Sequence, residues 1–266
     1  MSDGWSAVPR DWISNAGEIT KFAGRIVGDV YRLRVFRFTG EALRQAGILI
    51  VSSTLVIWGL VFIIGLQCGI EGAYFNRSVG NPAYAGVFSA WCDLRELVPY
   101  AFGYMMAAKV GTGIVAELGS MRISDEIDAL EVMGIRSVTF LCATRLLASW
   151  LVLPFVYIAA IGAGFAASYV AVVDQIKEVS SGGYSLIFWM FQNPPDLLYS
   201  LGKGMVMATA VVLVGCYYGY NARGGPVGVG TATAKSMVLS IVLVHIIGML
   251  GTQLFWGANP RAPIGG

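Results

Sequence analysis

Long uncharged apolar stretches recur along the chain and are separated by short polar segments. Because about 20 residues of helix cover the hydrocarbon core of a bilayer, such stretches predict helices that cross a membrane. They lie at residues 46–67, 97–118, 146–173, 204–220 and 236–256. The third stretch is longer than a bilayer requires, so we expect a tilted or projecting helix with a kink at Pro154. The pattern predicts an all-α integral membrane protein with five spans.

Two glycine-containing segments between the spans are interpreted as loops. Residues 68–95 contain four glycines and one proline, and residues 221–235 read NARGGPVGVGTATAK. Glycine and proline are the commonest residues of turns. The second segment lacks the GxxxxGK[ST] pattern of a phosphate-binding loop, so we expect a backbone turn there and no nucleotide site.

The first 45 residues form a separate region in which aromatic side chains are interleaved with cations. Six of its positive charges are Lys21, Arg25, Arg32, Arg34, Arg37 and Arg44. Aromatic rings favour the boundary between lipid and water, and cations are drawn to an anionic leaflet. Residues 1–45 are therefore interpreted as a cytoplasmic basic arm with an interfacial helix, and a loosely ordered arm is the alternative. Five spans then place the C-terminus outside the cell.

A short amphipathic helix is predicted at about residues 122–134, between the second and third spans. Its apolar face consists of Ile127, Leu130 and Met133, and an acidic stripe beside it consists of Asp125, Asp128 and Glu131. Ser124 is a suitable N-cap and Gly134 a suitable stop. Helices that lie on a membrane surface usually carry Lys and Arg, whereas this helix carries acids, which favours docking on a protein.

The composition supports a membrane protein that performs no chemistry on nucleotides itself. Hydrophobic residues make up 56% of the chain and charged residues 13%, about half the charged fraction of a soluble domain. No Walker A motif occurs, so any ATP hydrolysis belongs to another chain. With one histidine and no CxxC spacing, we expect neither a metal site nor catalytic residues. We expect membrane and lipid around this chain, and no nucleic acid.

The cysteines leave one question open. Cys142 and Cys216 fall at or within predicted spans, where a thiol serves as a small apolar side chain. Cys68 and Cys92 share the first predicted extracytoplasmic loop. A disulfide persists in that compartment, but free thiols are also common near membranes, so both states remain open.

Three ionisable residues lie inside predicted spans. Charge within a bilayer is expensive, so Lys109 and, two turns further on, Glu117 are candidates for a functional site. Snorkelling or pairing within the bundle is the structural alternative. His245 in the fifth span either relays protons or makes an ordinary hydrogen bond between helices.

Two ordered sequence blocks resemble a known family. The segment KVGTGIVAELGSMRISDEIDALEVMGI, residues 109–135, is similar to the signature of the MlaE/YrbE permease subunits. The stretch from Pro194 to Ser240, with Lys203 and GGPVGVG, is similar to the same family. The resemblance implies a permease domain over residues 46–266. The segment YYGYNARGGPVGVG and the basic arm look closest to the YrbE B-type permeases of actinobacterial Mce systems.

The resemblance implies a role for the chain as the permease subunit of an ATP-driven lipid transporter in the plasma (inner) membrane. In that family the helix at 122–134 couples to a cytosolic ABC ATPase, which uses ATP and Mg. The residues that would contact the ATPase are Arg122, Ser124, Asp125, Glu126, Asp128, Leu130 and Glu131. A paralogous permease would complete a lipid path, with Lys109 and Glu117 as lipid-path or charge-site residues. MCE-domain proteins would deliver the lipid for import. Which lipid is carried stays open.

Functions of other classes are also compatible with the residues. An ion- or proton-coupled secondary carrier would use Lys109, Glu117 and His245 as a relay and would work without an ATPase. A scaffold that gathers MCE proteins would tolerate charge reversal of the amphipathic helix. An intramembrane hydrolase is disfavoured because the chain has one histidine and no nucleophile motif.

Overall fold

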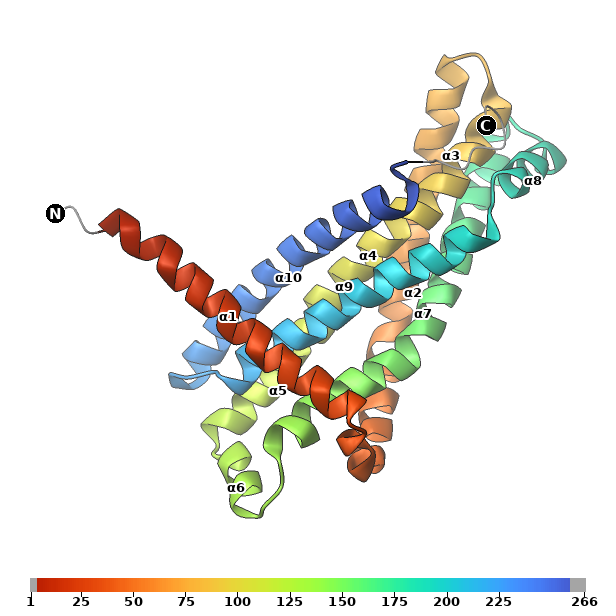
Figure 1. Cartoon of the computed structure of the whole chain (residues 1–266). Helices are drawn as coiled ribbons and strands as arrows, with labels where there is room; N and C mark the ends of the chain where they lie inside the picture. Colours follow the sequence, from red (N-terminus) through yellow and green to blue (C-terminus); the bar gives the residue numbers. More distant parts are fainter. Residues whose placement is uncertain (1–3, 259–266) are drawn as a thin grey trace.

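The computed structural model describes the backbone of residues 4–258 and the side chains of residues 15–258. The prediction for the C-terminal tail therefore falls almost entirely outside the described residues. Every regular element in the described part is helical, which confirms the predicted all-α class (Figure 1). The helices form an elongated bundle with α6 (Glu126–Val132) at one end and α3 (Ala85–Trp91) and α8 (Ser181–Met190) at the other. We call these the α6 end and the α3 end.

Four helices in the described part are long and apolar enough to cross a membrane. Their main parts are α2 (Thr39–Ser78), α7 (Thr144–Tyr169), α9 (Pro194–Tyr220) and α10 (Gly225–Trp256). Short helical turns extend the first to Arg34–Ser78 and the third predicted span to Thr139–Ile176. Pro154 lies inside α7, as the sequence predicts. These helices correspond to four of the five predicted spans.

The remaining predicted span, 97–118, is helical but less apolar. It belongs to a run of consecutive helical pieces: α3, η3 (Cys92–Leu97), α4 (Val98–Met105), η4 (Met106–Gly111) and α5 (Thr112–Ile123). The pieces η3 and η4 are wider π turns. The run lies against α2, α9 and α10, and the side chains of Val98, Phe102 and Met106 are completely buried. Its crossing of the membrane stays a prediction.

The prediction of a loop at residues 68–95 is wrong for most of that segment, which is helical. α2 continues to Ser78, and after a short turn the chain resumes as η2 (Pro82–Tyr84) and α3. Gly80, at φ 78°, does lie in the turn, but Gly69 and Gly72 mark close helix contacts. A Cβ on Gly69 would lie 2.9 Å from the Ser168 carbonyl oxygen, and one on Gly72 would lie 2.8 Å from the Phe88 ring. Small residues let helices approach in this way, so glycine alone did not indicate a turn.

The loop predicted at residues 221–235 is also mostly helix. α10 begins at Gly225. Gly224 and Gly225 both have positive φ, and Pro226 lies in the first turn of the helix. Proline suits that position because its missing N–H would have no partner there. Gly119 of α5 meets the Val229 side chain of α10, 2.8 Å from where a Cβ would stand. The segment therefore packs as a helix on α5.

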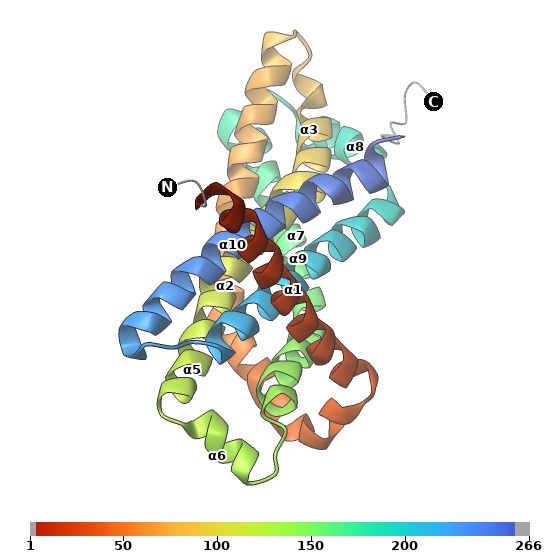
Figure 2. The same ribbon diagram turned by 60° about the vertical axis from the view of Figure 1, so that its left-hand side comes forward.

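The N-terminal arm forms a helix that crosses the outside of the bundle. α1 (Gly4–Tyr31) runs obliquely past α9 and η5 (Thr139–Ala143) (Figure 2), and its first half projects away from the other helices (Figure 1). Phe22, Ile26 and Val30 recur every fourth residue and are buried, and the Phe22 ring lies 5.7 Å from that of Tyr217. The arm is thus an amphipathic helix; its place on a leaflet stays a prediction.

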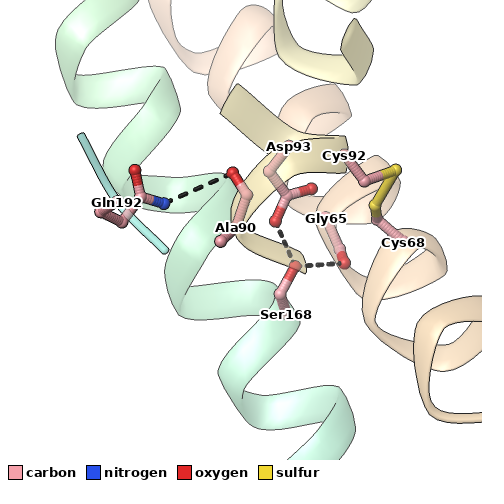
Figure 3. The surroundings of a disulfide bond; sticks show 7 residues. All are labelled: Gly65, Cys68, Ala90, Cys92, Asp93, Ser168 and Gln192. Carbon is pink, nitrogen blue, oxygen red and sulfur yellow. Dashed lines mark hydrogen bonds between the residues drawn. A yellow bond between two sulfur atoms is a disulfide. The ribbon is translucent and has the colours of Figure 1, made fainter. Parts of the chain in front are cut away.

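The α3 end is held together by a second apolar cluster and a cross-link. Tyr184 and Phe188 of α8 pack on α3, and their rings lie 5.7 Å apart. Cys68 of α2 and Cys92 of η3 are joined in a disulfide, with their Cα atoms 6.5 Å apart (Figure 3). Of the two states left open for these cysteines, the structure has the disulfide.

Candidate functional site

Buried charges meet at the α3 end, where η3, α9 and α10 come together. Arg95 donates to one oxygen of Asp196 through Nη2 at 2.7 Å and Nε at 3.2 Å. The Trp256 indole N–H donates to the other oxygen at 3.0 Å. The exposed fractions of the Arg95 and Asp196 side chains are 8% and 1%. Both charges have therefore left water, and each depends on the other for compensation.

A second ion pair, between Lys203 and Glu96, lies beside the first, and Glu96 directly follows Arg95 in the chain. The Lys203 ammonium, with a completely buried side chain, donates to Glu96 at 3.0 Å, to the Thr252 hydroxyl at 2.7 Å and to the Arg95 carbonyl oxygen at 2.9 Å. Thr252 in turn donates to the other Glu96 oxygen at 2.7 Å. Glu96 keeps 38% of its side chain exposed. We call Arg95, Asp196, Glu96, Lys203 and Thr252 the charge cluster.

An apolar pocket of about 590 Å³ opens beside the charge cluster. Its walls include Trp91, Phe88 and Trp256, and Arg95 and Glu96 also line it. The Arg95 guanidinium lies 4.4 Å from the centre of the Trp91 ring, within the range of a cation–π contact. A largely aromatic pocket that also contains fixed charges suits an amphiphile, which has both an apolar chain and a polar head.

Most of the charge cluster was not predicted from the sequence. Arg95 fell at the end of the loop predicted at 68–95, Lys203 entered only through the family resemblance, and Asp196 was not singled out. A usable signal was present: Arg95 and Glu96 directly precede one predicted span and Lys203 directly precedes another. Charges at the same end of neighbouring spans have a reason to pair, because unpaired burial is expensive.

Asp93 is a further buried carboxyl at this end (Figure 3). The Ser168 hydroxyl lies within hydrogen-bonding distance of both Asp93 and the Gly65 carbonyl oxygen, but it has a single hydrogen. Burial raises the pKa of the Asp93 carboxyl well above its usual range, against the lowering effect of the Ser168 hydrogen bond. A protonated Asp93 that donates to Ser168, while Ser168 donates to Gly65, satisfies both contacts.

The predicted coupling helix exists but begins later than expected. α5 ends at Ile123 and α6 spans Glu126–Val132. Ser124 is not the N-cap of α6: it is the C-cap of α5, with its backbone N–H donating to the Ser120 carbonyl oxygen at 3.1 Å, and Asp125 takes the N-cap position. Asp125 takes the preceding turn with φ 59°, a conformation that Asp tolerates better than most residues. Gly134, at φ 76°, ends the helix as predicted.

Several of the predicted coupling residues are engaged within the chain itself. Arg122 pairs with Asp128 at 2.6 Å, and Glu131 accepts from the hydroxyls of Ser137 at 2.6 Å and Tyr220 at 3.1 Å. Ile127 is completely buried and Leu130 partly so. The outward surface of α6 consists of Val132 and Met133, 89% and 66% exposed, together with Asp125, Glu126 and Asp128.

Lys109 and Glu117 line one small cavity of about 140 Å³, together with Gln45, Ser53 and Arg145. Glu117 forms an ion pair with Arg145 at 2.7 Å, which is the structural alternative considered for it. Lys109 is exposed and has no ion pair among residues 15–258.

The third member of the predicted relay lies elsewhere. His245 Nε2 lies 3.0 Å from the Tyr104 hydroxyl and Nδ1 lies 2.9 Å from the Ile241 carbonyl oxygen. Both ring nitrogens are thus engaged, and His245 does not line the Lys109 cavity. The structure gives His245 the interhelical hydrogen bond that was the alternative to a relay.

Comparison with known proteins decides the family. Residues 42–254 match the family model described as Permease MlaE. The chain belongs to the MlaE permease family. It is therefore a multi-pass transporter subunit, and the predicted family is confirmed, while the actinobacterial subtype stays a prediction.

Relatives of this MlaE-family chain come from several lineages. It is 28% identical to the chloroplastic protein TRIGALACTOSYLDIACYLGLYCEROL 1 of Arabidopsis thaliana, over 96% of the chain and 72% of that protein. It is 31% identical to a probable ABC transporter permease protein of Rickettsia bellii, over 61% of the chain and 62% of that protein. It is 25% identical to the intermembrane phospholipid transport system permease protein MlaE of Haemophilus influenzae, over 82% of the chain and 83% of that protein.

Proposed function

We propose that this chain is the permease subunit of an ATP-driven, MCE-type lipid transporter of the inner membrane. The family match carries the proposal. Two features of the fold support it: a pocket suited to an amphiphile at the α3 end and a short amphipathic helix at the α6 end. The relatives named as ABC transporter permeases support a separate ATPase, and the relative named for phospholipid transport supports a lipid substrate.

The α6 end faces the cytoplasm in this proposal. Cations gather there, including Arg25, Arg32, Arg136 and Arg223, and an excess of Lys and Arg is typical of cytoplasmic segments. The disulfide between Cys68 and Cys92 lies at the opposite end, which fits an oxidising compartment. The N-terminus is then cytoplasmic and the C-terminus extracytoplasmic.

One helical run connects the two ends mechanically. Arg95 and Glu96 lie near its start in η3, and α6 follows directly after its last piece, α5. Its 28 residues from 96 to 123 extend roughly 40 Å at 1.5 Å per residue. If an ATPase displaced α6, the movement would be transmitted to the charge cluster along this continuous helical run.

A second permease subunit completes the path in this proposal. Of the four long helices, α10 has the smallest buried share, 17% of its most apolar window. Its exposed side chains include Val238, Val242 and Leu250. The resemblance to YrbE B-type subunits supports a paralogous partner at such a face. In the proposal MCE-domain proteins deliver lipid at the α3 end, and the direction of transport is import.

The docking role of α6 is tested with Val132→Asp, which puts a charge on its most exposed apolar side chain. We expect the ATPase subunit to co-purify at least about tenfold more weakly, because burying the new carboxylate at an interface is costly unless it finds a partner. Val227→Asp is the matched control, because Val227 is 82% exposed at the start of α10 and outside α6.

Two results would contradict this role for α6. One is unchanged ATPase binding in Val132→Asp, and the other is an equal loss in both variants. Lipid uptake in proteoliposomes, measured with and without ATP, completes the test. Uptake that continues without ATP would favour the secondary carrier instead.

A further inference from the structure

A basic groove lies between α1 and the segment that joins α6 to α7. One hollow of about 660 Å³ is lined by residues of α1 and by residues 136–139, and an adjoining hollow of about 400 Å³ shares Arg34, Arg136 and Thr139 with it. The cations along the two hollows are Lys21, Arg25, Arg32, Arg34, Arg37 and Arg136. We call this feature the basic groove.

The charges of the basic groove do not balance within the chain. The larger hollow has five cations and two carboxylates, Asp29 and Glu131. Both carboxylates are occupied: Asp29 pairs with Arg34 at 3.2 Å and accepts from Thr139 at 2.6 Å, and Glu131 accepts from Ser137 and Tyr220. Among the described side chains, Lys21, Arg25, Arg32 and Arg136 have no ion pair. The groove therefore has cations available for an anion.

The sequence of α1 places these cations on one face. Lys21, Arg25 and Arg32 recur at i, i+4 and i+11, away from the buried stripe of Phe22 and Ile26. Gly24 and Gly28 also line the groove, and a Cβ on either would meet nothing within 4 Å. The wall of the groove is thus open, and a ligand can approach the helix backbone closely.

The chemistry of this arrangement favours a phosphate ester. Arg presents a planar fork of N–H donors that matches phosphate oxygens in pairs, and charge-assisted hydrogen bonds of this kind are the strong ones. Basic pockets between helices on the cytoplasmic side suit the head groups of anionic lipids. A volume of about 660 Å³ lies within the range of small-ligand sites.

We propose that the basic groove binds the phosphate of an anionic phospholipid headgroup. The lipid belongs to the leaflet on which α1 lies, and this placement rests on the orientation given under the proposed function. Such a ligand would join α1 to Arg136, two residues beyond the Gly134 that ends α6, while Glu131 of α6 lines the same groove. Binding would then restrain the base of the docking helix, and the lipid composition of the leaflet would influence coupling.

The test uses the full-length permease purified in detergent, without ATPase or ATP. Native mass spectrometry measures binding of short-chain phosphatidylglycerol and of phosphatidylcholine. The groove variant is Arg25→Gln with Arg136→Gln, and the control is Arg223→Gln, an exposed cation beyond α9 that does not line the groove. We expect phosphatidylglycerol to bind at least tenfold more tightly than phosphatidylcholine, and the groove variant to lose about tenfold for each arginine.

Competition identifies the source of the phosphate. If inorganic phosphate or pyrophosphate displaces phosphatidylglycerol at equal concentration, the site is one for soluble phosphate and the lipid assignment is wrong. Equal binding of both lipids, or an equal loss in Arg223→Gln, overturns the groove as an anion site. A groove variant that binds lipid normally but no longer binds the ATPase identifies a protein interface instead. Since no ATPase is present in the first measurement, a failed docking proposal would leave its outcome unaffected.

Discussion

The cations of the charge cluster at the α3 end and the exposed cations of the basic groove at the α6 end lie in opposite environments. At the α3 end, Arg95 and Lys203 are buried and each has a carboxylate partner from another helix. At the α6 end, Arg25, Arg32 and Arg136 are exposed and have no such partner among the described residues. Buried charge has to be compensated within the fold, whereas exposed charge remains available to a ligand or a partner. Mutations at the first end should therefore affect stability, and mutations at the second should affect binding.

The largest effect is expected for Asp196→Ala. It leaves the Arg95 guanidinium buried without its carboxylate and removes the acceptor of the Trp256 indole N–H. Loss of one partner of a buried pair typically costs about 3–5 kcal/mol. Thermal or denaturant unfolding in detergent measures the change. Asp174→Ala is the control, because Asp174 is exposed, and a similar loss there would contradict the distinction between the two kinds of charge.

A smaller and asymmetric effect is expected within the second ion pair. Glu96→Gln leaves a completely buried ammonium without its counter-charge, while Lys203→Met leaves a carboxylate whose side chain is 38% exposed and can be hydrated. Glu96→Gln should therefore be the more destabilising of the two. We expect a cost of about 1–3 kcal/mol, because the ammonium loses its counter-charge but keeps its hydrogen bonds to Thr252 and the Arg95 carbonyl oxygen. Unfolding of both variants side by side tests this order. The reverse order would mean that burial does not govern this pair.

The smallest effect on stability is expected at the α6 end. Arg136→Gln removes an exposed cation that has no ion pair among the described residues, so the free energy of unfolding should change by less than about 0.5 kcal/mol. The same unfolding experiment provides the measurement. A loss comparable with that of Asp196→Ala would show that Arg136 has a structural role, and the contrast between the two ends would fail.

Much of the fold could be predicted from the sequence because bilayer-length apolar runs leave few structural choices. α2, α7, α9 and α10 all lie where such runs predict helices. The predictions from glycine at 68–95 and 221–235 failed for a physical reason. Glycine serves turns and also close helix contacts, and composition alone does not distinguish the two uses.

The candidate site was harder to predict than the helices. The existence of the acidic helix after α5 could be predicted because its apolar and acidic positions form a local pattern. The prediction of Ser124 as its N-cap failed because Ser124 belongs to the end of α5. The pairs Arg95–Asp196 and Glu96–Lys203 join residues 101 and 107 positions apart. No local pattern carries such a pairing, because it arises only from the way the helices pack.

This separation along the chain also concerns the biogenesis of the protein. The ribosome delivers Arg95 and Glu96 about a hundred residues before Asp196 and Lys203, and Thr252 comes 156 residues after Glu96. The helical run 85–123 is thus synthesised before the partners of its charges. The charge cluster closes, and its pocket gains Thr252 and Trp256, only when α10 is in place.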